Sequence, residues 1–117
     1  MAELNKFTAK ESLNAETNAN WDPQTAITCT NTVEGVHSVS PGVMTVFVQP
    51  TSLSYIRYTW STSTATSGVI DETKDLLFKV QWYESLELRV PRNVGPVPVL
   101  HLLNYQAGSK TIKIVEA

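Results

Sequence analysis

Residues 55–60 read Tyr-Ile-Arg-Tyr-Thr-Trp, and residues 43–48 read Val-Met-Thr-Val-Phe-Val. In the first stretch Ile56, Tyr58 and Trp60 share one phase of a two-residue alternation, and aromatic and β-branched residues dominate, which predicts a long strand. The second stretch is apolar on both phases, which is typical of a strand in the middle of a packed sheet. Together they predict a protein built around β-sheet.

The same two-residue period recurs along the chain after about residue 25. Further strands are expected at residues 25–31, 36–40, 76–83, 86–90, 99–103 and 111–115. Gly35, the Pro41-Gly42 pair and the Ala107-Gly108 pair mark turns, and the Ser/Thr-rich residues 61–67 predict an exposed loop. Seven or eight short strands predict an all-β fold: an antiparallel β-sandwich, jelly-roll or immunoglobulin-like, or a small barrel.

The first 24 residues differ from the rest. Their large hydrophobic residues are Leu4, Phe7, Leu13 and Trp21. Thr8 and Glu11 have the spacing of a capping box, which is compatible with one short helix over residues 9–16. We therefore divide the chain into an N-terminal arm, residues 1–24, and a β-sandwich domain, residues 25–117.

Composition argues against several classes of protein. Nine Lys and Arg residues against eleven Asp and Glu residues give a net charge of −2 and no basic patch, which argues against a nucleic-acid binder. No apolar run approaches the roughly 18 residues of a membrane span, and the first residues lack the apolar region of a signal peptide. Cys29, the single cysteine, excludes an intramolecular disulfide and is expected to be a small buried hydrophobic residue.

No motif predicts a catalytic, cofactor or metal site. The titratable residues we considered are His37, His101, Asp71, Glu72, Asp75, Glu84 and Glu87. The histidines lack metal-ligand spacing, the acidic loop lacks the pattern of a calcium loop, and the glutamate pair gives no sign of flanking a cleft. A structural role without catalysis or metal binding is favoured for each of them. We expect hydrogen-bonded or half-exposed strand histidines, a solvated turn and exposed charges at a strand end.

Five Tyr and Trp residues lie in two of the expected strands: Tyr55, Tyr58, Trp60, Trp82 and Tyr83. Tyr58 and Trp60 share a phase, and Trp82 shares one with the apolar residues of its own strand, so these side chains are expected in the core. An exposed aromatic strip would instead stack on sugar rings. In that alternative the chain is a carbohydrate-binding module, with Tyr55 and Tyr83 as the exposed members.

The C-terminal third carries a resemblance to a known group. It reads Leu86-Glu-Leu-Arg-Val-Pro, then Val99-Leu-His-Leu-Leu-Asn, then Ala107-Gly-Ser-Lys-Thr-Ile-Lys-Ile-Val-Glu-Ala. This tail resembles small virion proteins of tailed phages, including capsid decoration (cement) proteins and head-fibre bases. The resemblance implies a non-enzymatic, homo-oligomeric protein, such as a trimer, that binds a major capsid or other virion protein. It also implies location in the virion after assembly in the host cytoplasm.

The arm supplies the expected partner contact. Ordering a polar segment costs about 1–2 kcal/mol per residue in backbone entropy, so the arm becomes ordered only if a contact offsets that cost. Burial of Phe7, Leu13 or Trp21 in a neighbouring subunit would return about 1.5–3 kcal/mol each. We therefore expect the arm to bind neighbouring subunits and the sheet to support it.

Overall fold

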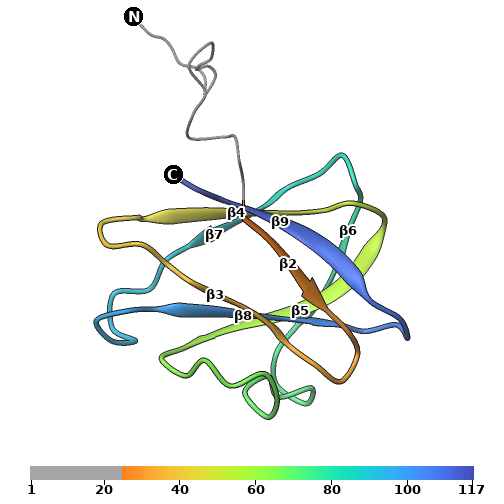
Figure 1. Cartoon of the computed structure of the whole chain (residues 1–117), viewed down its shortest axis with the longest axis horizontal. Helices are drawn as coiled ribbons and strands as arrows, with labels where there is room; N and C mark the ends of the chain where they lie inside the picture. The colour runs from red at the N-terminus through yellow and green to blue at the C-terminus, as the bar shows by residue number, and fades with distance from the viewer. Residues whose placement is uncertain (1–24) are drawn as a thin grey trace, which may run out of the picture.

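Figure 1 shows two stacked sheets in the computed structural model, which describes residues 25–117. These residues are all-β. The strands are β2 (Thr25–Cys29), β3 (Gly35–Ser38), β4 (Thr45–Pro50), β5 (Ser54–Ser61), β6 (Leu77–Val80), β7 (Leu86–Arg89), β8 (Val99–Asn104) and β9 (Lys110–Glu116). The short helix expected at residues 9–16, and the arm as a whole, lie outside the described residues.

The strand order identifies the type of sandwich. One sheet has the order β2-β9-β4-β7, the other has the order β3-β8-β5-β6, and every pairing is antiparallel. Apart from the connection between β5 and β6, each connection passes from one sheet to the other. Eight antiparallel strands wound in this way form a jelly roll. The predicted all-β sandwich is therefore confirmed, and the strand order selects the jelly roll among the alternatives.

The core lies between the two sheets. Alternate residues of each strand point inward, as the two-residue period requires. The largest inward side chains, all fully or almost fully buried, are Val46, Val48, Ile56, Leu100, Leu102, Ile112 and Ile114. Cys29 is buried among them as expected, and Tyr58, Trp60 and Phe78 pack against the same cluster from its margin. The interleaved apolar faces hold the two sheets together.

Strand β8 is buried on both faces, since all six of its residues are inaccessible. One face belongs to the core. The other lies beneath the long connection between β5 and β6, residues 62–76, which we call the crossover segment. Its Ser/Thr-rich residues 62–68 are exposed, as predicted, and Ile70 is buried. The crossover segment is thus exposed to solvent along residues 62–68 and also covers one face of β8.

The strand predicted for residues 76–83 is too long. β6 ends at Val80 because the main chain turns: Gln81 N donates to Glu84 Oε1 at 2.8 Å, and Glu84 N donates to Gln81 O at 3.0 Å. The alternation stops at that turn. The placement of Trp82 in the core was therefore wrong, and its side chain is 60% exposed.

Gly35 begins β3 instead of forming a turn. A Cβ atom at this position would lie 3.0 Å from Thr28 O and 3.2 Å from Ile27 Cδ1. Those contacts are tighter than side chains normally tolerate, so glycine allows β2 and β3 to approach each other across the edge of the sandwich. Gly35 was therefore correctly singled out, but it allows two strands to approach each other and does not form the expected turn.

The core makes a direct prediction for Ile112→Ala. Removing this fully buried side chain should lower the free energy of unfolding by about 2–5 kcal/mol, through lost burial and the cavity left behind. Thr111→Ala, one residue away on the solvent side, should cost less than about 1 kcal/mol. Urea denaturation of both variants measures the difference; equal effects would contradict the described orientation of β9.

Candidate functional site

The most connected polar group lies beneath the crossover segment. His101, in the middle of β8, is fully buried, and Glu34, just before β3, is 4% exposed. Glu34 Oε1 lies 2.9 Å from His101 Nδ1. Glu34 Oε2 accepts hydrogen bonds from Val69 N at 3.1 Å and Ile70 N at 2.9 Å. The carboxylate therefore joins β8 to the crossover segment.

The other imidazole nitrogen extends this network to a serine. His101 Nε2 lies 2.8 Å from Ser61 Oγ and 2.8 Å from Ser63 O. Carboxylate, imidazole and hydroxyl thus stand in the order found in serine hydrolases. Nothing in the spacing of Glu34, Ser61 and His101 along the chain signals this arrangement, which only the fold creates.

The hydrogen-bond geometry argues against a nucleophilic role for Ser61. A hydrolase needs Nε2 unprotonated, so that it can accept the hydroxyl proton. Here the Ser63 carbonyl, which only accepts hydrogen bonds, lies as close to Nε2 as Ser61 Oγ does, so this contact is a hydrogen bond only in a state with a proton on Nε2. A protonated Nε2 cannot act as general base. The arrangement therefore supports a structural role for the network: it fastens the crossover segment to the sheet.

The second histidine forms a separate contact between the sheets. His37 Nε2 on β3 lies 2.7 Å from Glu116 Oε2 on β9, and Ser40 N donates to the same oxygen at 3.0 Å. Partial burial acts to raise the pKa of Glu116, but the hydrogen bonds from Ser40 and His37 outweigh it, and the pKa lies below its ordinary value of 4.5. Both histidines are thus hydrogen-bonded, as predicted for strand histidines.

The remaining titratable candidates have local structural partners or lie in solvent. Burial raises the pKa of the Cys29 thiol to about 11, against the opposing effect of the Asn104 main chain, so the reactive thiolate is disfavoured. Asp71 Oδ1 accepts from the main chain and hydroxyl of Thr73, as in an ordinary turn. Within residues 25–117 no cluster of three or more His, Cys, Asp or Glu side chains is placed to hold a metal ion.

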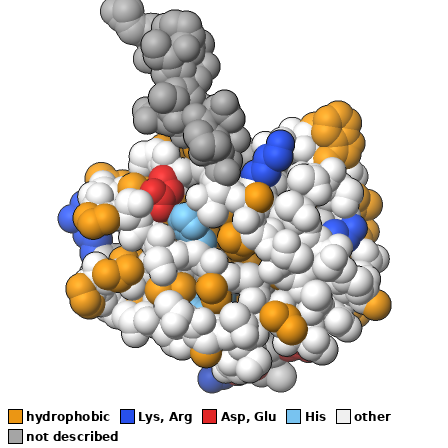
Figure 2. All heavy atoms as spheres, viewed as in Figure 1, with side chains coloured by type: hydrophobic (Ala, Val, Ile, Leu, Met, Phe, Trp, Pro, Cys, Tyr) orange, Lys and Arg blue, Asp and Glu red, His pale blue; other side chains and the backbone are white. Residues whose placement is uncertain are grey.

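Two exposed aromatic residues form the most prominent apolar feature. Trp82 and Tyr83 are 60% and 63% exposed, and their rings meet edge to face with centroids 5.3 Å apart. We call this pair the aromatic corner. Its backbone is fixed by the turn from Gln81 to Glu84 and by Gln49 Nε2, which donates to Trp82 O at 2.8 Å. In Figure 2 a hydrophobic side chain projects where Figure 1 places the turn between β6 and β7.

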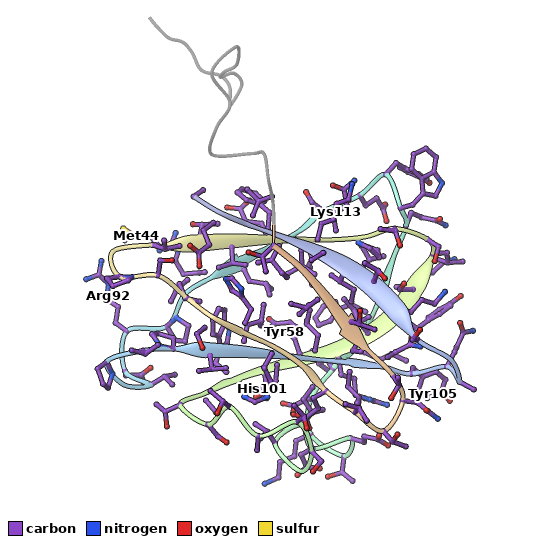
Figure 3. The ribbon with its side chains drawn as sticks, viewed as in Figure 1. Met44, Tyr58, Arg92, His101, Tyr105 and Lys113 are labelled. Carbon is purple, nitrogen blue, oxygen red and sulfur yellow. The ribbon has the colours of Figure 1, made fainter. Side chains whose placement is uncertain are left out.

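Two hollows flank the sandwich. One, of about 310 Å³, lies between residues 39–44 and 90–98; Met44 and Arg92 sit there at one end of the molecule (Figure 3). The other, of about 370 Å³, is lined by the aromatic residues Tyr58, Trp60 and Phe78 and by the polar residues at the end of the crossover segment. We call this second hollow the edge cleft. It is the hollow in which aromatic and polar groups converge.

The residues predicted for sugar stacking lie on different elements. Tyr83 belongs to the aromatic corner, whereas Tyr55 is half-buried on β5, opposite Lys79 of β6. No contact between the two side chains is described, and their joint role in stacking stays a prediction. Phe7, Leu13 and Trp21 lie outside the described residues, and their expected role in a partner contact stays a prediction.

The buried pair makes a prediction for Glu34→Ala. This change leaves the His101 imidazole and the Val69 and Ile70 main-chain groups without their acceptor inside the protein. We expect a loss of about 3–5 kcal/mol in the free energy of unfolding and faster proteolytic cleavage within the crossover segment. Ser61→Ala, which removes a half-exposed hydroxyl, should cost about 1 kcal/mol. Chemical denaturation and limited proteolysis test both; equal stability of the two variants would contradict the fastening role.

A second prediction concerns pH. Because the pKa of Glu116 is lowered in the folded protein, its carboxylate stabilises the fold above the ordinary value of 4.5, and this stability is lost as pH falls through the folded value. Glu116→Gln should therefore show a smaller loss of stability than the parent protein below about pH 5. Glu87→Gln, an exposed carboxylate on β7, is the matched control and should keep the parent's pH profile. Urea midpoints over a pH series measure the difference.

Comparison with known proteins found no match to a protein-family model, to a curated protein or to a solved structure. Within the described residues there is no helix long and apolar enough to cross a membrane. No relative supplies a function for transfer, so the residues of this chain and their geometry are the basis for the proposal that follows.

Proposed function

We propose that this chain is a non-enzymatic structural subunit of a virion: a decoration (cement) or minor capsid or tail protein that assembles as a homo-oligomer. The observation that carries the proposal is the jelly-roll strand order, because jelly rolls recur as the building unit of viral capsids. The same fold also serves other functions, including lectins, so the fold supports the proposal by analogy. Further support for the proposal comes from features of the protein surface.

The aromatic corner supports an assembly role. Trp and Tyr are the residues most enriched where binding energy concentrates in protein interfaces. Trp82 and Tyr83 stand in solvent on a backbone that is already fixed by hydrogen bonds from Gln49 and within the turn. A contact made by preorganised side chains loses less conformational entropy on binding. The corner is thus well suited to insert into a recess on a neighbouring subunit.

The arm is the second proposed contact. It joins the body at Thr25, the first residue of β2, and among the strands of residues 25–117 β2 lies at the edge of its sheet and pairs with β9. In the proposal the arm extends from this edge to a neighbouring subunit or to the major capsid protein, with Phe7, Leu13 and Trp21 as its anchors. All the core contacts described above are made within residues 25–117, so the body has its own hydrophobic core without the arm.

The chemistry of the body is compatible with a structural role. The imidazole of His101 lies within hydrogen-bond distance of Glu34, Ser61 and the Ser63 carbonyl. The thiol of Cys29 is buried, and the side chain of Asp71 accepts hydrogen bonds within its own turn. Each of these groups has a structural partner or a buried position. They support a stable scaffold.

The proposal predicts the outcome of two changes in assembly. In the full chain, Trp82→Ala combined with Tyr83→Ala should weaken self-association at least about tenfold, because hot-spot side chains typically contribute more than about 1.4 kcal/mol each. Deletion of residues 1–20 should leave a folded β domain that no longer joins its oligomer or particle. Sedimentation velocity over a range of concentrations measures the oligomer, and circular dichroism confirms the fold.

The matched control is Tyr105→Ala, since Tyr105 is 59% exposed but follows β8 and is not part of the aromatic corner. It should leave assembly unchanged. A parent chain that sediments as a clean monomer at all concentrations, and does not bind particles, would overturn the proposal. So would normal assembly of both the double variant and the truncated chain.

A further inference from the structure

The edge cleft is a consequence of unequal strand lengths. β5 pairs with β8 as far as Ser61↔Val99, but its pairing with β6 stops at Arg57↔Leu77. The second half of β5 therefore has no neighbour on that side. Residues 91 and 94, from the connection between β7 and β8, form the opposite wall. The cleft thus opens between the sheets, where Tyr58 lies between the two layers (Figure 3).

The free edge of β5 presents main-chain groups as well as side chains. Tyr55 O accepts from Tyr105 N, which fixes the alternation of hydrogen-bonding directions along β5. In an antiparallel pair every second residue directs both its N–H and C=O toward the same neighbour. By this alternation, Trp60 directs its main chain away from β8 and toward the edge that β6 leaves open. A ligand in the cleft would find a donor and an acceptor there.

The aromatic side chains of the cleft have free polar atoms. Within residues 25–117, the Tyr58 hydroxyl, the Trp60 indole N–H and the Lys74 ammonium group form no hydrogen bond. Among the described residues, Asn104 Oδ1 is the sole buried side-chain polar atom without a partner. The Tyr58 and Trp60 polar atoms therefore reach solvent. They provide convergent donors beside aromatic surface, which is the usual composition of a small-molecule site.

Most of the charged side chains beside the cleft are acidic. Lys74 lies beside Asp75, whose Oδ2 accepts from Asp71 N and whose main-chain carbonyl accepts from Arg57 Nη1 at 2.7 Å. The nearby Asp71 and Glu72 carboxylates make the cleft a poor site for an anion such as a phosphate. The polar atoms of Tyr58, Trp60 and Lys74 and the open shape of the cleft make it a poor site for an acyl chain. A neutral ligand with many hydroxyl groups fits this pattern better than either.

We propose that the edge cleft binds a neutral pyranose ring of a glycan. The apolar C–H face of the ring would lie against the aromatic surface of Tyr58, Trp60 and Phe78, since the electron-rich faces of aromatic rings attract such groups. Its hydroxyl groups would bond the Tyr58 hydroxyl, the Lys74 ammonium and the free main-chain groups of Trp60. A volume of about 370 Å³ is enough for one or two sugar rings.

This site differs from the one suggested by the sequence. The sequence suggested Tyr55 and Tyr83, whereas the edge cleft is lined by Tyr58 and Trp60, which were expected in the core and contact both the core and the cleft. The site is also separate from the aromatic corner, because β6 runs from Leu77 at the cleft to Val80 just before the corner. Sugar binding and assembly are therefore independent proposals.

The test uses the full chain and four neutral disaccharides: maltose, cellobiose, lactose and chitobiose. Saturation-transfer NMR detects millimolar binding, and titration of tryptophan fluorescence gives the dissociation constant. Binding of at least one disaccharide is expected. Tyr58→Phe removes only the hydroxyl, and Lys74→Ala changes an exposed side chain, so both variants should fold. Each should weaken binding about fivefold, the equivalent of one hydrogen bond.

Matched controls remove the same groups elsewhere. Tyr105→Phe and Lys113→Ala alter exposed residues away from the cleft (Figure 3) and should bind like the parent. Trp82→Ala should also bind sugar normally, whatever it does to assembly. Absence of binding to all four disaccharides at millimolar concentration would overturn the proposal, as would binding that Tyr58→Phe and Lys74→Ala both leave unchanged. Binding restricted to an acidic sugar such as glucuronic acid, or to an extended peptide, would overturn it too.

Discussion

The contact between the Glu34 carboxylate and the His101 imidazole is the interaction on which the rest of the sandwich depends. Both groups are buried and have lost their hydrating water, so removal of either partner would strongly lower the stability of the fold. Through Val69 and Ile70 the same carboxylate holds the crossover segment against β8. That segment has to end where β6 begins, at Leu77, and the short pairing of β6 with β5 leaves the edge cleft open. One buried polar contact thus fastens the crossover segment over a face of the sheet.

The two proposed functions occupy opposite ends of β6. At its start, the chain leaves the crossover segment and the edge cleft lies beside β5. Just past its end, the turn from Gln81 to Glu84 projects Trp82 and Tyr83 into solvent. A four-residue strand is short and rigid, so the two surfaces keep a fixed separation. A subunit that assembles through one end of β6 would keep the cleft at the other end open to solvent.

Much of the fold was predictable because every second residue of a strand points toward the core and is therefore usually apolar. The alternation in β5, the apolar run in β4 and the turn glycines were sufficient to predict a sandwich. The prediction from sequence failed at Trp82, because a hydrogen bond from Gln81 N to the Glu84 carboxylate forms the turn that ends the strand, and no periodicity signals it. It also failed for Glu34 and His101, which lie far apart in the chain and meet only when β3 pairs with β8. The edge cleft depends on where the pairing of β5 with β6 and the pairing of β5 with β8 end. The length of a strand pairing cannot be read from the pattern of side chains.

The place of β9 in its sheet has a consequence for how the chain folds as it is made. β9 is the last of the described strands, yet it lies between β2, the first of them, and β4. Until residues 110–116 leave the ribosome, the pairings of β2 and β4 with β9 cannot form. Contacts between segments so distant in sequence form slowly, and open edges in the meantime invite pairing with other chains. Folding of residues 25–117 therefore has to wait for the synthesis of β9, and the open edge of β4 raises the risk of aggregation until then.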